Sequence, residues 1–253
     1  MIGMRSLGVL LCLVACMGTA RSQSYPRWFL EQGLLKCGLT AVGYSNKGFY
    51  KDSSASQAAR DARQNLVRQR MTLVAGDQAF WTTEAGTAWM GGDLTVSVDS
   101  AALKTAAADT GKAEIYFGDD MIISLVTLSG CDLPDSMKEL SGMPVEEPSW
   151  VRGMPSASSR IYSMGVAPRY FYESSSWEAA ERMALLGLAR EGGDSVIAME
   201  KNVPGSGQQI LNEHVSVALR NFGINARWFD ARDQVFYVLM AADRRNIAEH
   251  PAK

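Results

Sequence analysis

The sequence predicts an α+β fold built from two homologous domains, each a mainly antiparallel sheet with two helices packed on one face. Three observations lead to this prediction. A segment near the N-terminus recurs 122 residues later, residues 113–130 match residues 226–243 in pattern, and both copies show strand-like and helix-like periods in the same order. The expected order of elements in each copy is β-α-β-α-β-β.

The repeat rests on identical residues at a constant spacing. Pro26 and Trp28 return as Pro148 and Trp150, which places the copies 122 residues apart. Eleven positions of copy one are identical at this spacing, namely Pro26, Trp28, Gly43, Phe49, Tyr50, Ser53, Ser54, Ala58, Arg60, Ala62 and Leu66. So many identities over so short a stretch indicate a tandem duplication.

Each copy is expected to open with a short strand and a long helix. Residues 39–45 and 161–167 have the composition of strands. The serines after them, Ser53-Ser54 and Ser174–Ser176, are predicted helix N-caps, and alanines spaced three and four apart predict a helix that lies close to a sheet. The residues expected to end the two helices are Gly76-Asp77 and Gly193-Asp194.

The later part of each copy is expected to hold a second helix and a hairpin. Copy two shows a strand over 195–203 and then a helical period over Gln208–Asn221, and Leu94–Ala108 is the corresponding helix expected in copy one. The closing hairpins are expected to turn at Gly118–Asp120 and Ala231–Asp233. The spacing of 113 residues between these ends gives copy one nine extra residues, which we assign to Gly76–Gly92.

These patterns divide the chain into five segments. An export signal covers residues 1–20, the first domain 25–131, a linker 132–146, the second domain 147–246 and a polar, frayed tail 247–253. The linker is assigned because its Pro, Gly, Met and acidic residues show no regular period.

The N-terminal segment predicts export. A short, weakly positive start is followed by the apolar run Leu7–Ala15, which is too short to span a membrane. Two processing routes stay open: cleavage after Ala20 would leave Arg21 as the first residue, whereas Leu13-Val14-Ala15-Cys16 resembles a bacterial lipobox, in which Cys16 would be lipidated. We favour lipidation because the four lipobox positions match in order.

Two cysteines remain in the mature chain. Cys37 precedes the expected strand 39–45, and Cys131 follows the expected strand 121–128. Antiparallel pairing of these strands would bring the two thiols together, and an exported protein meets an oxidising compartment. The alternative, two buried free thiols, stays open.

Few residues point to catalysis or to a cofactor. The net charge of −2 and the pI near 5.8 argue against nucleic-acid binding. His214 and His250 are the two histidines of the chain, and no nucleophile elbow, phosphate-binding loop or metal-ligand spacing occurs. We therefore expect no catalytic site, cofactor or metal. The adjacent carboxylates Asp119-Asp120 and Glu146-Glu147 are interpreted as solvated turn residues.

Aromatic residues recur at the same places in the two copies. We expect most of them in the core, with some lining a partner or ligand surface. The candidate residues are Trp28, Phe49, Tyr50, Trp150, Phe171 and Tyr172.

The Pro-x-Trp start, the glycine-containing first strand and the S-x-x-x-A-x-x-x-A-x-x-x-L helix together resemble the lipoprotein-20 family of membrane-associated bacterial lipoproteins. The resemblance covers Pro26 to about Leu73 and Pro148 to about Arg190, and two copies depart from the family's usual single domain. It implies a lipidated cysteine and attachment at the outer membrane, facing the periplasm or the cell surface, in flagellum-associated or other envelope structures.

Two functions are considered on this basis. The first is a non-enzymatic envelope lipoprotein that acts as a scaffold or adaptor, with acyl chains on Cys16 in the membrane, protein partners in the cell envelope and self-association. The second is a periplasmic carrier or unrecognised enzyme that binds a small apolar or peptide ligand between the domains.

Overall fold

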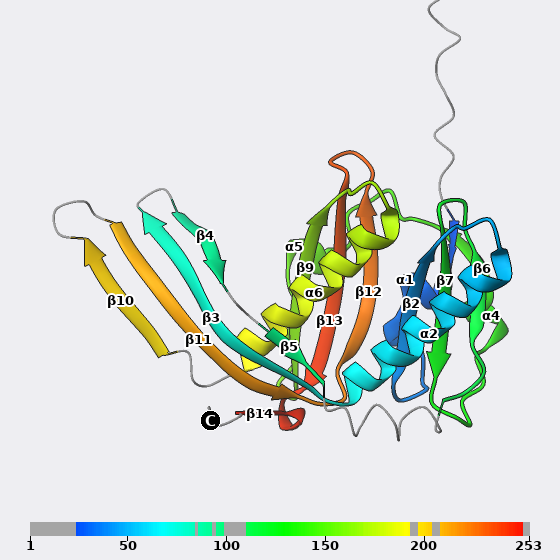
Figure 1. Ribbon diagram of the computed structural model, residues 1–253, viewed down its shortest axis with the longest axis horizontal. Coiled ribbons are helices and arrows are strands. Elements are labelled where there is room, and N and C mark those ends of the chain that lie inside the picture. Colours follow the sequence, from blue (N-terminus) through cyan, green and yellow to red (C-terminus); the bar gives the residue numbers. More distant parts are fainter. Residues whose placement is uncertain are drawn as a thin grey trace, which may run out of the picture.

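The structure is a computed structural model that describes residues 24–83, 86–92, 95–98, 110–192, 197–203 and 208–249 (Figure 1). It is an α+β protein, as the sequence predicts. The α-helices are α1 (Arg27–Leu30), α2 (Lys51–Arg70), α4 (Asp135–Lys138), α5 (Ser149–Arg152) and α6 (Glu173–Gly192), with short 3-10 helices η1 (Gln32–Leu34) and η3 (Arg244–Asn246). The strands are β1 (Ser24–Pro26), β2 (Thr40–Asn46), β3 (Thr72–Thr83), β4 (Gly86–Gly92), β5 (Thr95–Ser97), β6 (Glu114–Phe117), β7 (Met121–Thr127), β8 (Leu140–Gly142), β9 (Arg160–Pro168), β10 (Ile197–Val203), β11 (Gln208–Leu219), β12 (Gly223–Asp230), β13 (Val235–Asp243) and β14 (Ile247–Glu249).

The two copies share the order short helix, first strand, long helix, long hairpin and closing hairpin, to which copy one adds β1, η1 and β5. Helices α2 and α6 are both 20 residues long and begin at Lys51 and Glu173, again 122 residues apart. In each copy the closing hairpin pairs with the first strand, which gives the antiparallel sheets β2-β7-β6 and β12-β13-β9. The expected first strands and closing hairpins are therefore present at the predicted places.

One glycine in each first strand allows its helix to lie against the backbone of the sheet. A Cβ on Gly43 would lie 2.1 Å from the backbone N of Ala62 in α2, and a Cβ on Gly165 would lie 1.8 Å from the backbone O of Ala180 in α6. Because such distances are impossible for real atoms, only glycine permits this approach. The alanines that face these glycines have small side chains, so both helices can approach their strands closely.

The prediction of a second helix in copy two is wrong. Residues 208–219 form the strand β11 instead, which pairs with β10 on one side and β3 on the other. In copy one, Thr95–Ser97 form β5, and most of the corresponding segment up to Ala108 lies outside the described residues. Each copy thus has one long helix followed by a long hairpin.

The predicted helix ends were also partly wrong. Helix α2 ends at Arg70, and Gly76-Asp77 lies inside β3, whereas Gly193-Asp194 lies outside the described residues. The serines are not N-caps, because Ser54 and Ser176 lie inside the helices. Their hydroxyl oxygens instead accept hydrogen bonds from the backbone N–H of Gly48 and Tyr170, the same bond in both copies.

The two long hairpins join into one sheet that crosses from copy to copy. Its strand order is β10-β11-β3-β4, with β5 beside β3 and β14 beside β11. Strands β3 and β11 pair from Thr72 with Leu219 to Thr82 with Gln209. The outer part of this sheet projects away from the helices (Figure 1), and we call β3, β4, β10 and β11 the arm.

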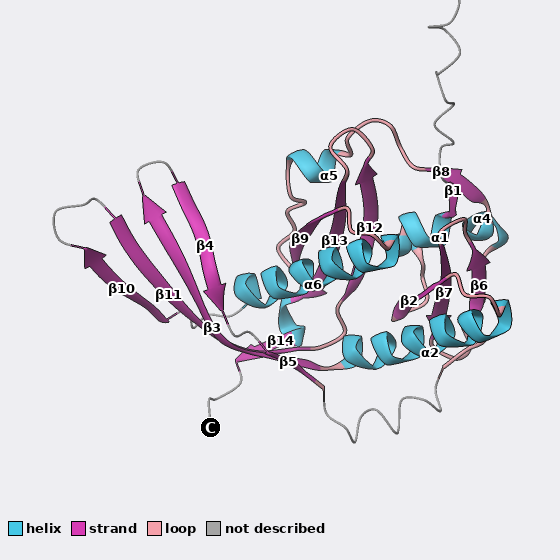
Figure 2. Ribbon diagram, turned by 45° about the horizontal axis from the view of Figure 1, so that its top comes forward, coloured by secondary structure: helices cyan, strands magenta, loops and turns pink. Residues whose placement is uncertain are grey.

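The remaining elements stack in layers, which Figure 2 shows most clearly. Helix α2 covers one face of the sheet β2-β7-β6, and the other face of that sheet packs on α1 and α6. Helix α6 then covers one face of β12-β13-β9. Buried residues of both copies belong to one hydrophobic cluster, so the two halves share a core rather than forming separate cores.

The segment assigned as a linker is folded. Residues 140–142 form β8, which pairs with β1, and Met137 of α4 is buried in the shared core. The tail is folded in part, because residues 247–249 form β14 on β11, while residues 250–253 lie outside the described residues.

Candidate functional site

The contact between the two copies is an aromatic cluster. The ring of Phe29 on α1 lies 5.4 Å from that of Trp177 on α6, and Trp177 lies 4.7 Å from Phe236 on β13. Tyr25 stacks on Phe29 and donates a hydrogen bond from its hydroxyl to Glu173. Rings in edge-to-face contact add to the stabilisation given by their burial. The start of copy one is therefore built into copy two.

A buried ion pair lies beside this cluster. The guanidinium of Arg227 on β12 contacts Oε1 of Glu181 at 2.7 Å, and it also donates to the backbone O of Phe29 and to Gln32. Tyr44 on β2 donates its hydroxyl to the same carboxylate. Burial disfavours the charged guanidinium, but Tyr44 and Glu181 outweigh this effect and raise the pKa of Arg227. Arg227 thus ties copy two to α1 and η1 of copy one, and Glu181 ties it to β2.

A cleft of about 400 Å³ opens between α2 and α6. Its walls carry charges of both signs, including Asp61 and Arg68 from α2 and Glu178 and Arg182 from α6. Burial raises the pKa of Asp61, although a hydrogen bond from the Tyr44 N–H opposes that shift. The pKa of Glu178 is also raised, first by burial and then by the negative charges of Asp61 and Glu181.

One buried polar atom of this cleft has no hydrogen-bond partner. Gln69 is 5% exposed and its Oε1 is unpaired in the described structure, while its backbone O accepts from the N–H of Phe222. An unpaired buried acceptor is costly.

The face of each three-stranded sheet that points away from α2 or α6 is covered to a different extent in the two copies. In copy one, Thr40, Val42 and Tyr44 point away from α2 and are all less than 8% exposed, because residues 25–34 and copy two cover them. The corresponding residues of copy two are partly exposed. We call Trp150, Val151, Met154, Tyr162, Met164 and Val166 the open face.

The open face is exposed because α5 does not pack as α1 does. Trp28 of α1 is 1% exposed, whereas α5 contains no buried residue and Trp150 is half-buried. Met154 and Val166 are 49% and 41% exposed. Copy two thus exposes the β9 side of this apolar face, while Leu239 and Trp228 on the same face are buried, and the counterpart in copy one is covered by protein.

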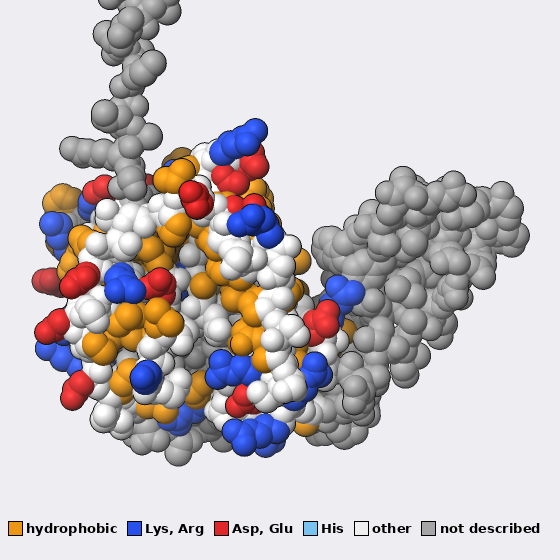
Figure 3. All heavy atoms as spheres, turned by 180° about the vertical axis from the view of Figure 1, so that it is seen from behind, with side chains coloured by type: hydrophobic (Ala, Val, Ile, Leu, Met, Phe, Trp, Pro, Cys, Tyr) orange, Lys and Arg blue, Asp and Glu red, His pale blue; other side chains and the backbone are white. Residues whose placement is uncertain are grey.

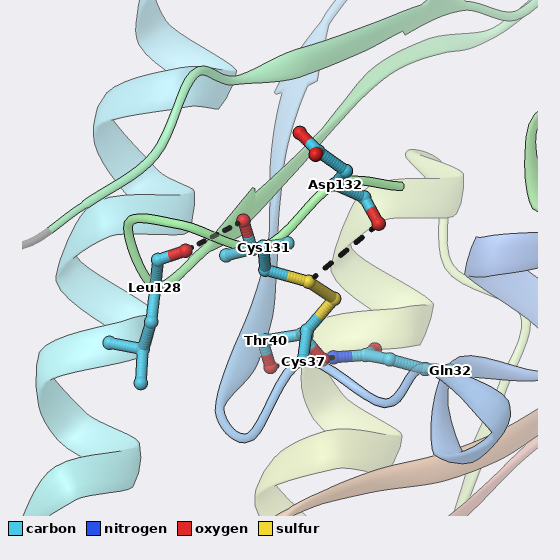
Figure 4. The surroundings of a disulfide bond; sticks show 7 residues. Gln32, Cys37, Thr40, Leu128, Cys131 and Asp132 are labelled. Atoms are coloured by element: carbon cyan, nitrogen blue, oxygen red, sulfur yellow. Dashed lines mark hydrogen bonds between the residues drawn. A yellow bond between two sulfur atoms is a disulfide. The ribbon is translucent and has the colours of Figure 1, made fainter. Parts of the chain in front are cut away.

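Cys37 and Cys131 form a disulfide in the structure (Figure 4). Their Cα atoms are 5.4 Å apart, within the usual range for a disulfide. They meet because Thr40 at the start of β2 pairs with Thr127 at the end of β7. The bridge lies close to Gln32, whose amide donates to Thr40, so it borders the contact between the copies.

The six aromatic candidates fall into three groups by burial. Trp28 belongs to the core and Trp150 to the open face. Phe49, Tyr50, Phe171 and Tyr172 are all exposed, and Phe49 and Phe171 are both 93% exposed. The rings of each neighbouring pair meet edge to face, with an interplanar angle of 86° in both copies.

The remaining sequence candidates give no reactive cluster. His214 lies on β11 rather than on a helix, and its Nδ1 is 2.8 Å from Oδ1 of Asp77 on β3. Cys16 and His250 lie outside the described residues. Within the described ranges, no helix is long and apolar enough to cross a membrane, and no three metal-binding side chains gather. Figure 3 shows cationic and anionic side chains interspersed over the back of the body.

Sequence reasoning missed the Arg227–Glu181 pair and the cleft. The pair joins α6 and β12 within copy two, and the cleft lies between the helices of the two copies, so both depend on tertiary packing that no local pattern records. No protein-family model matches this chain, and no significant match was found among the curated proteins or the solved structures.

Proposed function

We propose that this protein is an exported, lipid-anchored envelope lipoprotein with a non-enzymatic scaffold or adaptor role. The observation that carries the scaffold role is the open face, because an equivalent face in the same molecule is fully covered by protein. Contiguous exposed apolar surface is typical of a protein-interaction site. The lipoprotein-20-like segments and the position of Cys16 support the anchor.

The anchor is tested by the mass and location of the mature protein. We expect the wild type to begin at Cys16, to carry the mass of acyl chains and to remain in the membrane fraction. Cys16→Ala should lose both properties, while Cys12→Ala, within the same apolar run, should keep them. A wild-type chain that begins near Arg21 and stays soluble would refute the anchor.

The scaffold role is tested by position-specific cross-linking in cells. A photo-reactive residue at Val166 should give a discrete cross-linked product, and the same residue at the exposed Gln57 of α2 should not. Met164→Lys should abolish the product, because a buried unpaired charge would oppose docking. A product that is insensitive to this substitution, or no product at all, would argue against the open face as the partner site.

A second candidate function is favoured by the cleft between α2 and α6. Its volume suits a small ligand, and its charged walls favour a polar ligand rather than an apolar one. In this proposal the protein is a periplasmic carrier. Native mass spectrometry of gently purified protein should then show a bound small molecule that Asp61→Asn releases, and a bare protein mass would count against it.

A further inference from the structure

Exposed aromatic side chains gather at one end of the molecule. Among the side chains that the structure describes, every exposed Phe, Tyr or Trp lies in two loops or at one strand end on this side of the molecule. These residues, which we call the aromatic end, are Phe49, Tyr50, Phe117, Tyr170, Phe171 and Tyr172. Other exposed large apolar residues, such as Leu34 and Met183, are aliphatic.

Hydrogen bonds show that these loops are neighbours. Lys47 donates to the backbone O of Asp119, which joins the Phe49 loop to the turn after β6. Ser174 donates to Asn46, which joins the start of α6 to the end of β2. The aromatic end is therefore one surface built from both copies, on the upper side of the body in Figure 1.

The chain enters the folded body at the same end. The backbone O of Ser24 accepts a hydrogen bond from Tyr116 on β6, and Tyr25 reaches Glu173 at the start of α6. Cys16 lies eight residues before Ser24. Eight residues span at most about 29 Å when fully extended, so an acylated Cys16 would hold the aromatic end close to the bilayer.

The chemistry of this surface fits the bilayer interface. Aromatic rings are favoured at the boundary between lipid tails and headgroups, where their apolar bodies leave water. The neighbouring charges are of both signs, with Lys47, Lys51 and Arg169 beside Asp52 and Asp119. Attraction to anionic lipid is therefore not needed for contact.

We infer that the aromatic end is a second membrane contact, which places the rings of both copies in the interface of the bilayer that holds the anchor. The inference rests on the proposed lipid anchor for the choice of membrane. The rings of both copies plus one anchor would fix the orientation of the body, which a single point of attachment does not.

Oxidative footprinting of the full-length lipidated protein tests the contact. On phosphatidylcholine vesicles, we expect the rings of the aromatic end to react with hydroxyl radicals several-fold more slowly than on Cys16→Ala protein free in solution. Leu34 and Met183 are the internal controls and should react equally in both samples. Rings that stay equally reactive on vesicles would refute the contact.

A binding measurement separates the rings from the anchor. Unlipidated Cys16→Ala protein should bind phosphatidylcholine vesicles weakly, and Phe49→Ser with Phe171→Ser should reduce that binding about tenfold or more. Both side chains are 93% exposed, so the fold should not change. The control is Leu34→Ser with Met183→Ser, which should bind as before.

The outcomes are distinguishable. Binding that requires anionic lipid and disappears in salt would replace the aromatic contact with an electrostatic one and would refute the inference. Protection of the rings only when another envelope protein is present would also refute it. An acylated protein whose rings stay reactive would support the proposed anchor and refute the aromatic contact. A wild-type protein that is not acylated but binds vesicles through these rings would refute the anchor and support the contact.

Discussion

At the scale of single residues, the two copies are related by the contacts that their identical residues make. Gly43 and Gly165 occupy the same place under α2 and α6, and both face alanines. A duplicated sequence could retain such glycines by chance, but here each is required by the distance between helix and strand. The repeated letters of the sequence are thus explained by a repeated packing constraint.

Replacing either glycine should destabilise the protein strongly. We expect Gly43→Ala and Gly165→Ala each to lower the free energy of unfolding by roughly 3 kcal/mol or more, because the new methyl group would force the helix away from the strand. Gly153→Ala is the control, since nothing lies within 4 Å of its Cβ position and its φ is −155°, and it should change stability by less than about 0.5 kcal/mol. Chemical denaturation measures all three. Equal effects at Gly43 and Gly153 would disprove the packing argument.

The carboxyl group of Glu178 should make stability depend on pH. Its folded pKa lies above the ordinary value of 4.5, because burial, Asp61 and Glu181 disfavour its ionised form. Below pH 4 both the folded and the unfolded states are protonated and nothing is lost, but stability falls as the pH rises through the folded pKa. Glu178→Gln should therefore be more stable than the wild type at pH 7, and this difference should vanish near pH 4.

The gain in the free energy of unfolding from Glu178→Gln at pH 7 should be only about a few tenths of a kcal/mol, because the Glu178 side chain is partly solvated. Thermal unfolding at a series of pH values provides the measurement, and Glu191→Gln near the end of the same helix is the charge-matched control. A difference that grows on acidification would contradict the assigned direction.

At the scale of elements, local pattern succeeded where an element packs within its own copy. The strands around Gly43 and Gly165, the two long helices and the closing hairpins all have their partners nearby in sequence, and their periods predicted them. The prediction for residues 208–219 was wrong because the spacing of their apolar residues also fits a helix. The alternation of Val215, Val217 and Leu219 suits a strand equally well, and β3 of the other copy decides between the two.

The candidate site was predictable to a similar extent. The exposed aromatic pairs follow from the repeat, because the same two rings occur before each helix. The open face does not, since Trp28 and Trp150 have the same local sequence context but opposite burial. That difference arises because copy two packs on α1, whereas none of the described residues covers α5 to the same extent. Such tertiary contacts cannot be read from the local sequence.

The disulfide ties two elements of copy one together and should contribute strongly to stability. Cys37 and Cys131 are 94 residues apart, and closing a loop of that size restricts the unfolded chain by about 4 to 5 kcal/mol in the chain-entropy account. Cys37→Ala with Cys131→Ala should lower the free energy of unfolding by about 3 to 5 kcal/mol in chemical denaturation. Reducing the wild type should have a similar effect, and reductant should leave the double variant unchanged. A wild type that is insensitive to reductant would contradict this expectation.

At the scale of the whole molecule, the two copies form one unit. They share a hydrophobic cluster, a buried ion pair between Arg227 and Glu181 that reaches Phe29, and the paired strands β3 and β11. A chain of two independent domains on a linker would have none of these. The tandem duplication therefore describes the sequence, whereas the folded body is single.

We expect the mature protein to unfold in one cooperative transition. Calorimetry should give one peak whose van't Hoff enthalpy equals the calorimetric enthalpy, because neither copy keeps a complete core without the other. Glu181→Ala should lower the midpoint of the whole transition, since it leaves the Arg227 guanidinium buried without its partner, at a cost of about 3 to 5 kcal/mol. Two resolved peaks, with only the second shifted by this substitution, would show that the copies unfold separately.

The pairing of β3 with β11 also bears on how the protein reaches its folded state. Asp77 and His214, which face each other across these strands, are 137 residues apart. Because the chain is made from its N-terminus, β3 is complete long before its partner and has one edge unpaired until Leu219 has been added. Contacts of such long range slow folding and leave strand edges open to wrong partners. Shielding of this strand edge until β11 is in place is therefore a requirement that the topology places on the folding of the chain.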